Sequence, residues 1–246
     1  MKTKLPEKWK IPESLSKRFG YKGAGKQRAM AADGHLLLIL HKLDEKLERE
    51  AIIFWRNPKG EWRDSMNGNG MYRLNCLIWD YSEQEILLSN KYEKAVKPED
   101  YFDLLETLTP LVRTVTATAQ ALQQARELQG GPDIIDLRDE TQEIAQDLEI
   151  LYTDAKNGLE YTVAKRAEEQ ASYALKTSRS TDKLNILVAV FLPITAMSGI
   201  FGMNMKNGLE DMPIIAFWLM MIISFVLGLG VKSWILKEGN MKTKES

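Results

Sequence analysis

The side chains most often used in catalysis are few in this 246-residue chain, and their spacing does not assemble a reaction centre. There are two histidines, His35 and His41, and one cysteine, Cys76, without the neighbouring ligands of a metal site. The basic stretch at residues 23–27 (GAGKQ) lacks the full spacing of a phosphate loop and the Ser or Thr that would reach a metal. The sequence therefore predicts a protein that is not an enzyme.

Polar residues of chemical interest lie instead within, or at the end of, long uncharged segments. Residues 184–204 and 212–231 carry no charge, and each run has about the length that crosses ~30 Å of hydrocarbon as a helix. Thr195 lies inside the first run and Asn204 at its end. A threonine in a membrane helix commonly bonds its own backbone, and an asparagine at the end of a span suits the membrane surface. The short link at 205–211 predicts a transmembrane hairpin.

The distribution of charge indicates how the hairpin is oriented. The net charge is −1, which argues against a nucleic-acid-binding protein, and most charges lie in residues 1–183. Basic residues lie close to the outer ends of both spans, namely Lys165, Arg166, Lys176, Arg179, Lys183, Lys232, Lys237, Lys242 and Lys244. The positive-inside rule therefore places both termini in the cytoplasm. We expect a multi-pass protein of the cell (inner) membrane that contacts lipid and no nucleic acid.

A small α/β portion precedes the helices. Residues 1–31 show no sustained period and are expected to form a loose arm. Strands are expected over 34–42, 51–56 and 61–65, the last two joined at the turn signal Asn57-Pro58-Lys59-Gly60. A helix is expected over 71–94. Together these elements form an N-terminal cytoplasmic α/β domain over 1–97.

The remaining chain is expected to be helical. Pro98, followed by two acidic residues, marks a helix start, and residues 130–132 (GGP) mark a break. No proline follows until Pro193, so one helix on the order of 100 Å long is expected over 133–204. Such a helix needs lateral partners, and the Ala-rich residues 164–174 suit close approach of copies of the chain. The expected division is a stalk at 98–183, a first span at 184–204, an external loop at 205–211, a second span at 212–236 and a cytoplasmic tail at 237–246.

Three short motifs carry a resemblance to a known family. Gly202-Met203-Asn204 follows an apolar span, Leu192-Pro193-Ile194-Thr195 lies inside that span, and Met212-Pro213 opens the second one. In this order and position the motifs resemble those of the CorA-type divalent-cation transporters, a family that includes the ZntB zinc-transporting branch. The similarity covers roughly residues 98–236.

The resemblance implies a mainly α membrane protein that assembles as a homopentameric funnel, with first spans lining a pore and second spans outside them. Gly202, Met203 and Asn204 would form the selectivity filter, and Thr195 and Gly199 would supply polar pore positions. Leu184, Val188 and Leu192 would form a hydrophobic constriction that gates by dewetting. Mg²⁺ releases its waters reluctantly, and neutral amide oxygens from Asn204 can accept hydrogen bonds from those waters without holding the ion too tightly.

The external loop and the stalk leave the transported ion open. Glu210 and Asp211 can concentrate cations at the mouth, whereas Lys206 opposes them. The family implies Mg²⁺ as cargo, with Co²⁺ and Ni²⁺ as further candidates, and Mg²⁺ as a regulatory ion, with no other cofactor. Carboxylates are abundant on the stalk and are interpreted as a solvated helix face: Asp133, Asp136, Asp139, Glu140, Glu143, Asp147 and Glu149. Two alternatives stay open, a ZntB-like proton-coupled Zn²⁺ transporter and a non-conducting membrane scaffold.

Overall fold

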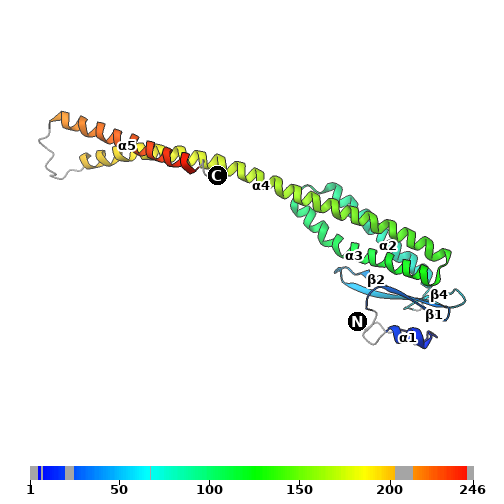
Figure 1. The fold of residues 1–246 in the computed structure, drawn as a ribbon. Helices are drawn as coiled ribbons and strands as arrows, with labels where there is room; N and C mark the ends of the chain where they lie inside the picture. Colours follow the sequence, from blue (N-terminus) through cyan, green and yellow to red (C-terminus); the bar gives the residue numbers. More distant parts are fainter. Residues whose placement is uncertain (1–4, 7, 20–24, 67, 203–212, 243–246) are drawn as a thin grey trace. The chain divides into compact units, whose positions relative to one another are not determined.

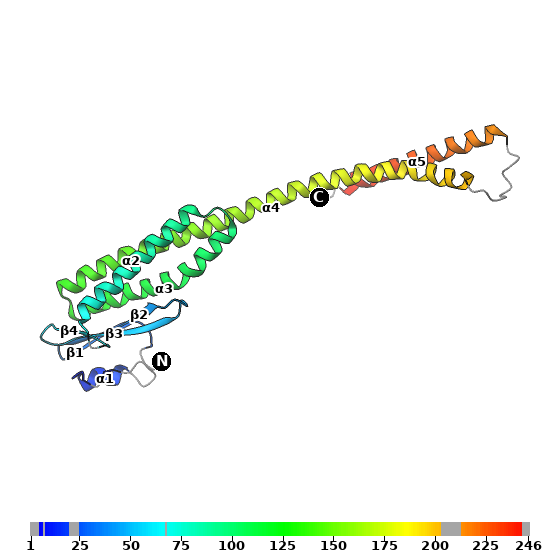
Figure 2. The ribbon, with the colours of Figure 1, turned by 180° about the vertical axis from the view of Figure 1, so that it is seen from behind.

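The computed structural model describes residues 5–6, 8–19, 25–66, 68–202 and 213–242. The chain divides into two compact units, Met1–Lys165 and Arg166–Ser246. The described residues are mainly helical and include one small antiparallel sheet and one long helix, α4, which contributes to both units (Figures 1 and 2). This class of fold was predicted from the sequence.

The first unit is built on a four-stranded antiparallel sheet in the order β1-β2-β3-β4. Its strands are β1 (Arg28–Ala32), β2 (His35–Leu43), β3 (Arg49–Arg56) and β4 (Trp62–Asp64). Asp33 and Gly34 form the β1–β2 turn with φ of 51° and 76°, values that favour a tight two-residue hairpin. The predicted β3–β4 hairpin is confirmed.

The prediction of a loose arm over residues 1–31 is wrong in two places. The short helix α1 spans Glu13–Phe19, and β1 pairs with β2 along its full length. β1 has the sequence RAMAA, whose alanines have little strand preference of their own, so pairing with β2 decides its conformation. His35 and His41 both lie within β2.

Both faces of the sheet are covered, which explains why β2 reads as an unbroken apolar run. On one face Leu36, Leu38 and Phe54 belong to the core shared with the long helices. On the other, Leu37 and Trp55 belong to a second core under α1. The second core also contains Trp9, Leu15, Phe19, Met30, Ile39 and Ile53. The sheet is therefore the middle layer between α1 and the helices (Figure 1).

On the other face of the sheet, α2 (Gly70–Lys94) packs on β3 and β4, and α3 (Pro98–Gln129) packs on β1 and β2. The first part of α4 (Pro132–Gly202) contributes residues such as Leu137 and Ile144 to the same core. The predicted start of α3 at Pro98 and the break before Pro132 are confirmed. The Asp100 carboxylate accepts the backbone N–H groups of Val96 and Lys97, and these bonds lower the pKa of that carboxyl group. The helix start is thus fixed by a side chain as well as by the proline.

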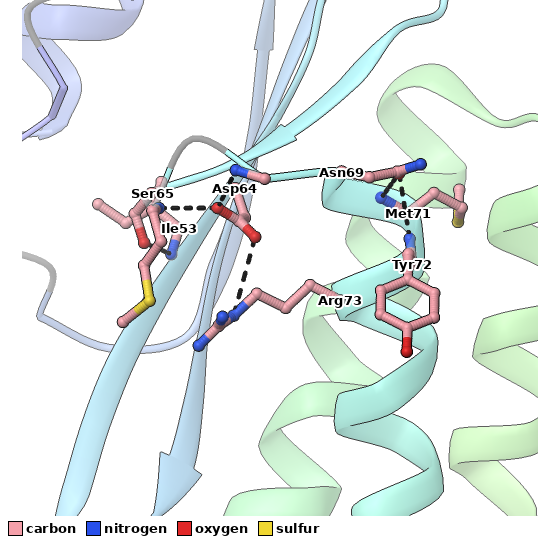
Figure 3. Close-up of polar contacts among 9 residues, drawn as sticks. Ile53, Asp64, Ser65, Asn69, Met71, Tyr72 and Arg73 are labelled. Carbon is pink, nitrogen blue, oxygen red and sulfur yellow. Dashed lines mark hydrogen bonds and ion pairs between the residues drawn. The ribbon is translucent and has the colours of Figure 1, made fainter.

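The join between β4 and α2 depends on one buried carboxylate. Asp64 is 2% exposed, and its Oδ1 accepts the N–H groups of Met66 at 2.7 Å and Gly68 at 2.9 Å. Its Oδ2 lies 3.9 Å from Nε of Arg73, one turn into α2 (Figure 3). The side chain of Asn69 caps α2 by accepting the N–H groups of the next residues. These contacts set the direction in which α2 leaves the sheet.

A polar network crosses the main core between sheet and helices. The Gln27 side chain donates to the Thr114 carbonyl at 2.8 Å and accepts from the Thr118 hydroxyl at 2.8 Å. The Tyr81 hydroxyl donates to the carbonyl of His41 and also contacts Thr118. Burial raises the pKa of Tyr81 to about 12. Polar groups that pair inside a core fix one register of the packed elements, because any slip leaves them unpaired.

The second unit contains the remainder of α4 and the helix α5 (Ile214–Lys242), which lie side by side. The expected helix over 133–204 is confirmed as far as Gly202, and residues 203–204 lie outside the described residues. α4 is unbroken through Pro193.

Candidate pore face on helix α4

The expected pore-lining residues lie in one stretch of α4. Leu184, Val188 and Leu192 are 60%, 48% and 65% exposed, and Thr195 and Gly199 are exposed as well. Gly202 is the last residue of α4. The other filter residues, Met203 and Asn204, and the external-loop residues Lys206, Glu210 and Asp211 lie outside the described residues.

One side of α4 between residues 184 and 202 is partly covered by other residues. Six of its residues are half-buried: Ile186, Ala189, Val190, Pro193, Ile194 and Met197. At 3.6 residues per turn their mean direction lies about 180° from that of the five expected pore residues. We call the side opposite to it (Leu184, Val188, Leu192, Thr195 and Gly199) the pore face, after the role expected for it, and the half-buried side the α5 face. Exposed residues such as Leu187 lie between the two sides.

The α5 face is covered by small residues of α5. Ser224 is 4% exposed, and Gly228, one turn later, is buried. A Cβ atom on Gly228 would lie 2.9 Å from the Val190 carbonyl oxygen and 3.1 Å from the Val190 Cα. The two backbones therefore approach as closely as glycine permits. Ser224 and Gly228 were not predicted as functional residues, although small residues four positions apart in an apolar run are a known signal of helix packing.

The pore face changes in chemistry along its length. Leu184, Val188 and Leu192 present apolar side chains. Further along, the Thr195 hydroxyl donates to the Phe191 carbonyl at 2.9 Å, which matches the alternative that this threonine bonds its own backbone. A Cβ on Gly199 would have no atom within 4 Å. One side of the helix thus joins an apolar band to a polar, open end.

The carboxylates of the stalk are largely distributed along the outside of α4. Among the described residues, no group of three or more His, Cys, Asp or Glu side chains is arranged to hold a metal ion. Asp133 accepts a hydrogen bond from the Trp62 indole at 3.1 Å, and Asp139 pairs with Arg138 at 2.8 Å. Partial burial, with the nearby charge of Asp147, raises the pKa of Glu85 on α2.

A charged cavity between the sheet and α2 has an internal structural role. It encloses about 400 Å³ and is lined in part by Lys42, Asp80, Asp64 and Arg73. Lys42 Nζ lies 2.6 Å from Asp80 Oδ2, and Arg73 is aligned with Asp64. These charges are balanced within the cavity, so its polar groups tie β2 and β4 to α2.

One helix in the described part of the chain, α4, is long and apolar enough to cross a membrane by length and composition. Its most apolar window has a mean hydropathy of 1.7 and is 0% buried. In α5 the corresponding apolar stretch, Phe217–Gly230, is shorter. A helix with 0% of this window buried is unlike the core helix of a soluble domain.

Comparison with known proteins places the chain in a family. The model of the CorA-like Mg²⁺ transporter protein family matches residues 87–237, which include the stalk, the pore face and most of α5. The chain belongs to this family of membrane-embedded divalent-cation transporters. No curated protein matches it.

Two solved structures are similar. The structure of full-length CmaX matches with a TM-score of 0.50 at 14% identity and covers 94% of this chain and 82% of that one. The CorA magnesium transporter of Methanocaldococcus jannaschii matches with a TM-score of 0.48 at 16% identity and covers 92% of this chain and 83% of that one. At this identity the likeness to CmaX shows the fold.

Proposed function

We propose that the protein conducts divalent cations, most favourably Mg²⁺, through a pore formed by the α4 helices of a homopentamer. The second spans form the outer ring, and both termini lie on the cytoplasmic side. Asn204 forms the selectivity filter with Gly202 and Met203, and Leu184, Val188 and Leu192 form the gate. Membership of the CorA-like family supports divalent-cation transport. The choice of ion, the filter and the gate are proposed from the residues of α4 and the motif that follows it.

The observation that carries the proposal is the division of α4 into two sides. α5 of the same chain covers the α5 face, whereas Leu184, Val188 and Leu192 remain 60%, 48% and 65% exposed. In a bundle of copies with α5 on the outside, the side of α4 opposite α5 is directed toward the axis. That side contains Thr195, whose hydroxyl a lipid-facing side would not require, and Gly199, which leaves open space beside the backbone.

The chemistry of this side suits an ion that keeps its hydration shell. Mg²⁺ retains several waters, and bound waters donate hydrogen bonds outward. Because the Thr195 hydroxyl donates its proton to Phe191, its oxygen lone pairs remain available to accept from such a water. Asn204 supplies neutral carbonyl oxygens of the same kind. Leu184, Val188 and Leu192 offer no polar partner, so a narrow ring of them excludes water when closed.

The test is ion uptake by the full-length protein in liposomes, followed with a Mg²⁺-sensitive dye. Asn204→Ala is compared with wild type and with Asn207→Ala, which removes an amide three residues later, in the external loop, that has no assigned role. We expect Asn204→Ala to lower Mg²⁺ uptake by about tenfold or more, because each subunit loses one acceptor for the hydrated ion. Asn207→Ala should retain uptake.

The same assay separates the alternatives. Unchanged uptake of Mg²⁺, Co²⁺, Ni²⁺ and Zn²⁺ by Asn204→Ala would remove this residue from the filter. Zn²⁺ uptake that rises with an imposed proton gradient would favour the proton-coupled zinc transporter. Absence of current under every ion condition in wild type would favour the non-conducting scaffold.

A further inference from the structure

We infer that Gly228 of α5 is a positioning residue for the pore helix: it holds α5 against the turn of α4 that precedes Pro193 and thereby sets the distance of Val188 and Leu192 from the pore axis. This inference rests on the proposed function, because it concerns how wide the gate is.

The turn before Pro193 lacks one backbone hydrogen bond because of the chemistry of proline. Pro193 has no backbone N–H, so the carbonyl of Ala189, four residues earlier, lacks its usual helical donor. In a membrane such a carbonyl must be accommodated by a neighbouring element, because no water replaces the lost bond. The turn from Ala189 to Pro193 is therefore the part of the pore helix that most needs a partner.

Gly228 lies at that turn. A Cβ on Gly228 would be 2.9 Å from the Val190 oxygen and 3.5 Å from the Ala189 oxygen, so the glycine backbone faces the two carbonyls at the proline turn. Contacts of Cα–H groups with carbonyl oxygens are a recurring feature of close helix interfaces. On the same helix, a Cβ on Gly230 would have nothing within 4 Å. Of these two glycines, Gly228 alone makes the close fit.

The direction of the effect follows from the two sides of α4. Val190, Ala189 and Pro193 belong to the α5 face, and Val188 and Leu192 belong to the pore face on the other side. A methyl group added at Gly228 cannot enter the Val190 backbone, so α4 and α5 must separate. Since α5 lies outside α4, separation moves the pore face inward and narrows the ring of Val188 and Leu192.

The experiment compares Gly228→Ala with the matched control Gly230→Ala, both in the full-length protein. Mg²⁺ influx into liposomes and the thermal unfolding midpoint in detergent are measured for each. Gly228→Ala is expected to lower the influx by about tenfold and to lower the midpoint, since overpacking of a close contact is costly. Gly230→Ala is expected to leave both near wild type. Equal effects of the two substitutions would overturn the inference.

A second substitution tests whether the contact acts through the proline turn. Pro193→Ala restores the N–H that Ala189 lacks, so the Ala189 carbonyl no longer depends on the close contact with Gly228. We expect the loss caused by Gly228→Ala to be markedly smaller in the Pro193→Ala background. A loss that is the same in both backgrounds would overturn the assignment, because independent sites add. If Gly228→Ala only lowered the stability of the whole protein, Pro193→Ala would not reduce its effect.

The two readouts keep the inference separate from the proposed function. If wild type conducts no divalent cation, the proposed function fails, and the unfolding midpoints alone decide whether Gly228 seats α5 on α4. A further outcome is that Gly228→Ala fails to fold while Gly230→Ala folds. In that case, folded protein from the double variant Gly228→Ala/Pro193→Ala supports the proposed contact between Gly228 and α4. A double variant that also fails to fold counts against this contact.

Discussion

The hydroxyl of Thr195 donates a hydrogen bond to the carbonyl oxygen of Phe191, four residues earlier in α4, at 2.9 Å. This bond uses the only proton of the side chain and holds its oxygen in one place. A threonine held in this way offers acceptor lone pairs and no donor. Such a group suits water molecules bound to a cation, whose protons are directed outward.

Thr195→Val removes this acceptor while it keeps the shape of the side chain. We expect divalent-cation influx into liposomes to fall by about tenfold, because each subunit of the pore loses one acceptor for the hydrated ion. Thr195→Ser keeps the hydroxyl and should retain most of the influx. The exposed Ser198 lies off the pore face, so Ser198→Ala is the control. A loss that is equal in the Val and Ser variants would show that the hydroxyl has no role in conduction.

Leu192→Ala tests the apolar gate. Leu192 is 65% exposed and belongs to the pore face, so truncation widens the ring and weakens dewetting. We expect a raised leak of Mg²⁺ under conditions that keep wild type closed. Leu187 is 55% exposed but lies about a quarter turn from the pore face, and Leu187→Ala serves as the matched control. The gate would be wrongly placed if the control leaked as much as Leu192→Ala.

Asp64→Ala tests the join between the sheet and α2. The substitution removes the acceptor of two backbone N–H groups and the ion partner of Arg73, so the free energy of unfolding should fall by about 2–3 kcal/mol. Asp44 makes a similar pair of bonds, to the N–H groups of Lys46 and Glu48, but is exposed. Asp44→Ala should cost less than about 1 kcal/mol. Urea unfolding followed by tryptophan fluorescence makes the comparison, and equal costs would contradict it.

We expect the raised pKa of Tyr81 to lower the free energy of unfolding at alkaline pH. Its pKa is raised from 10.0 to about 12 by burial, so the folded state keeps this proton at pH values where the unfolded state has released it. The stabilisation is therefore complete below pH 10 and is lost as the pH rises toward 12. The loss amounts to about 2–3 kcal/mol, and it should be absent in Tyr81→Phe. The exposed Tyr173→Phe should unfold like wild type across this range, and a similar profile for Tyr81→Phe would refute the prediction.

The long helices were predictable because their ends are marked by residues with strong local rules. α3 begins at Pro98 and ends before the GGP sequence at residues 130–132. α4 begins at Pro132, and because no proline follows until Pro193, one continuous helix could be predicted. The hairpin of β3 and β4 was predictable from its turn residues. α1 was missed because its seven residues are too few to show a sustained apolar period, although Glu13 lies in its first turn and Lys17 and Arg18 in its last. β1 was missed because its alanines have little strand preference. Their structure depends on the sheet face and the strand edge that they meet.

The pore face was predictable only in part. The spacing of Val188, Leu192 and Thr195 placed them on one side of a helix, but spacing cannot say which side a second helix covers. That depends on Gly228 and Ser224, which lie far along the chain and carry little hydrophobic signal of their own. The close approach of Gly228 to Val190 is a tertiary contact within the second unit, and the spacing of residues in α4 alone does not predict it.

The central claim is that copies of α4 place their pore faces around one axis and leave the α5 faces outward. A cryo-EM map of the purified full-length assembly, with and without Mg²⁺, tests it most directly. The account predicts an axial passage lined by Leu184, Val188, Leu192, Thr195 and Gly199, with density for a hydrated ion beside Asn204 when Mg²⁺ is present. A map in which these side chains face lipid, or in which no shared passage exists, would contradict it.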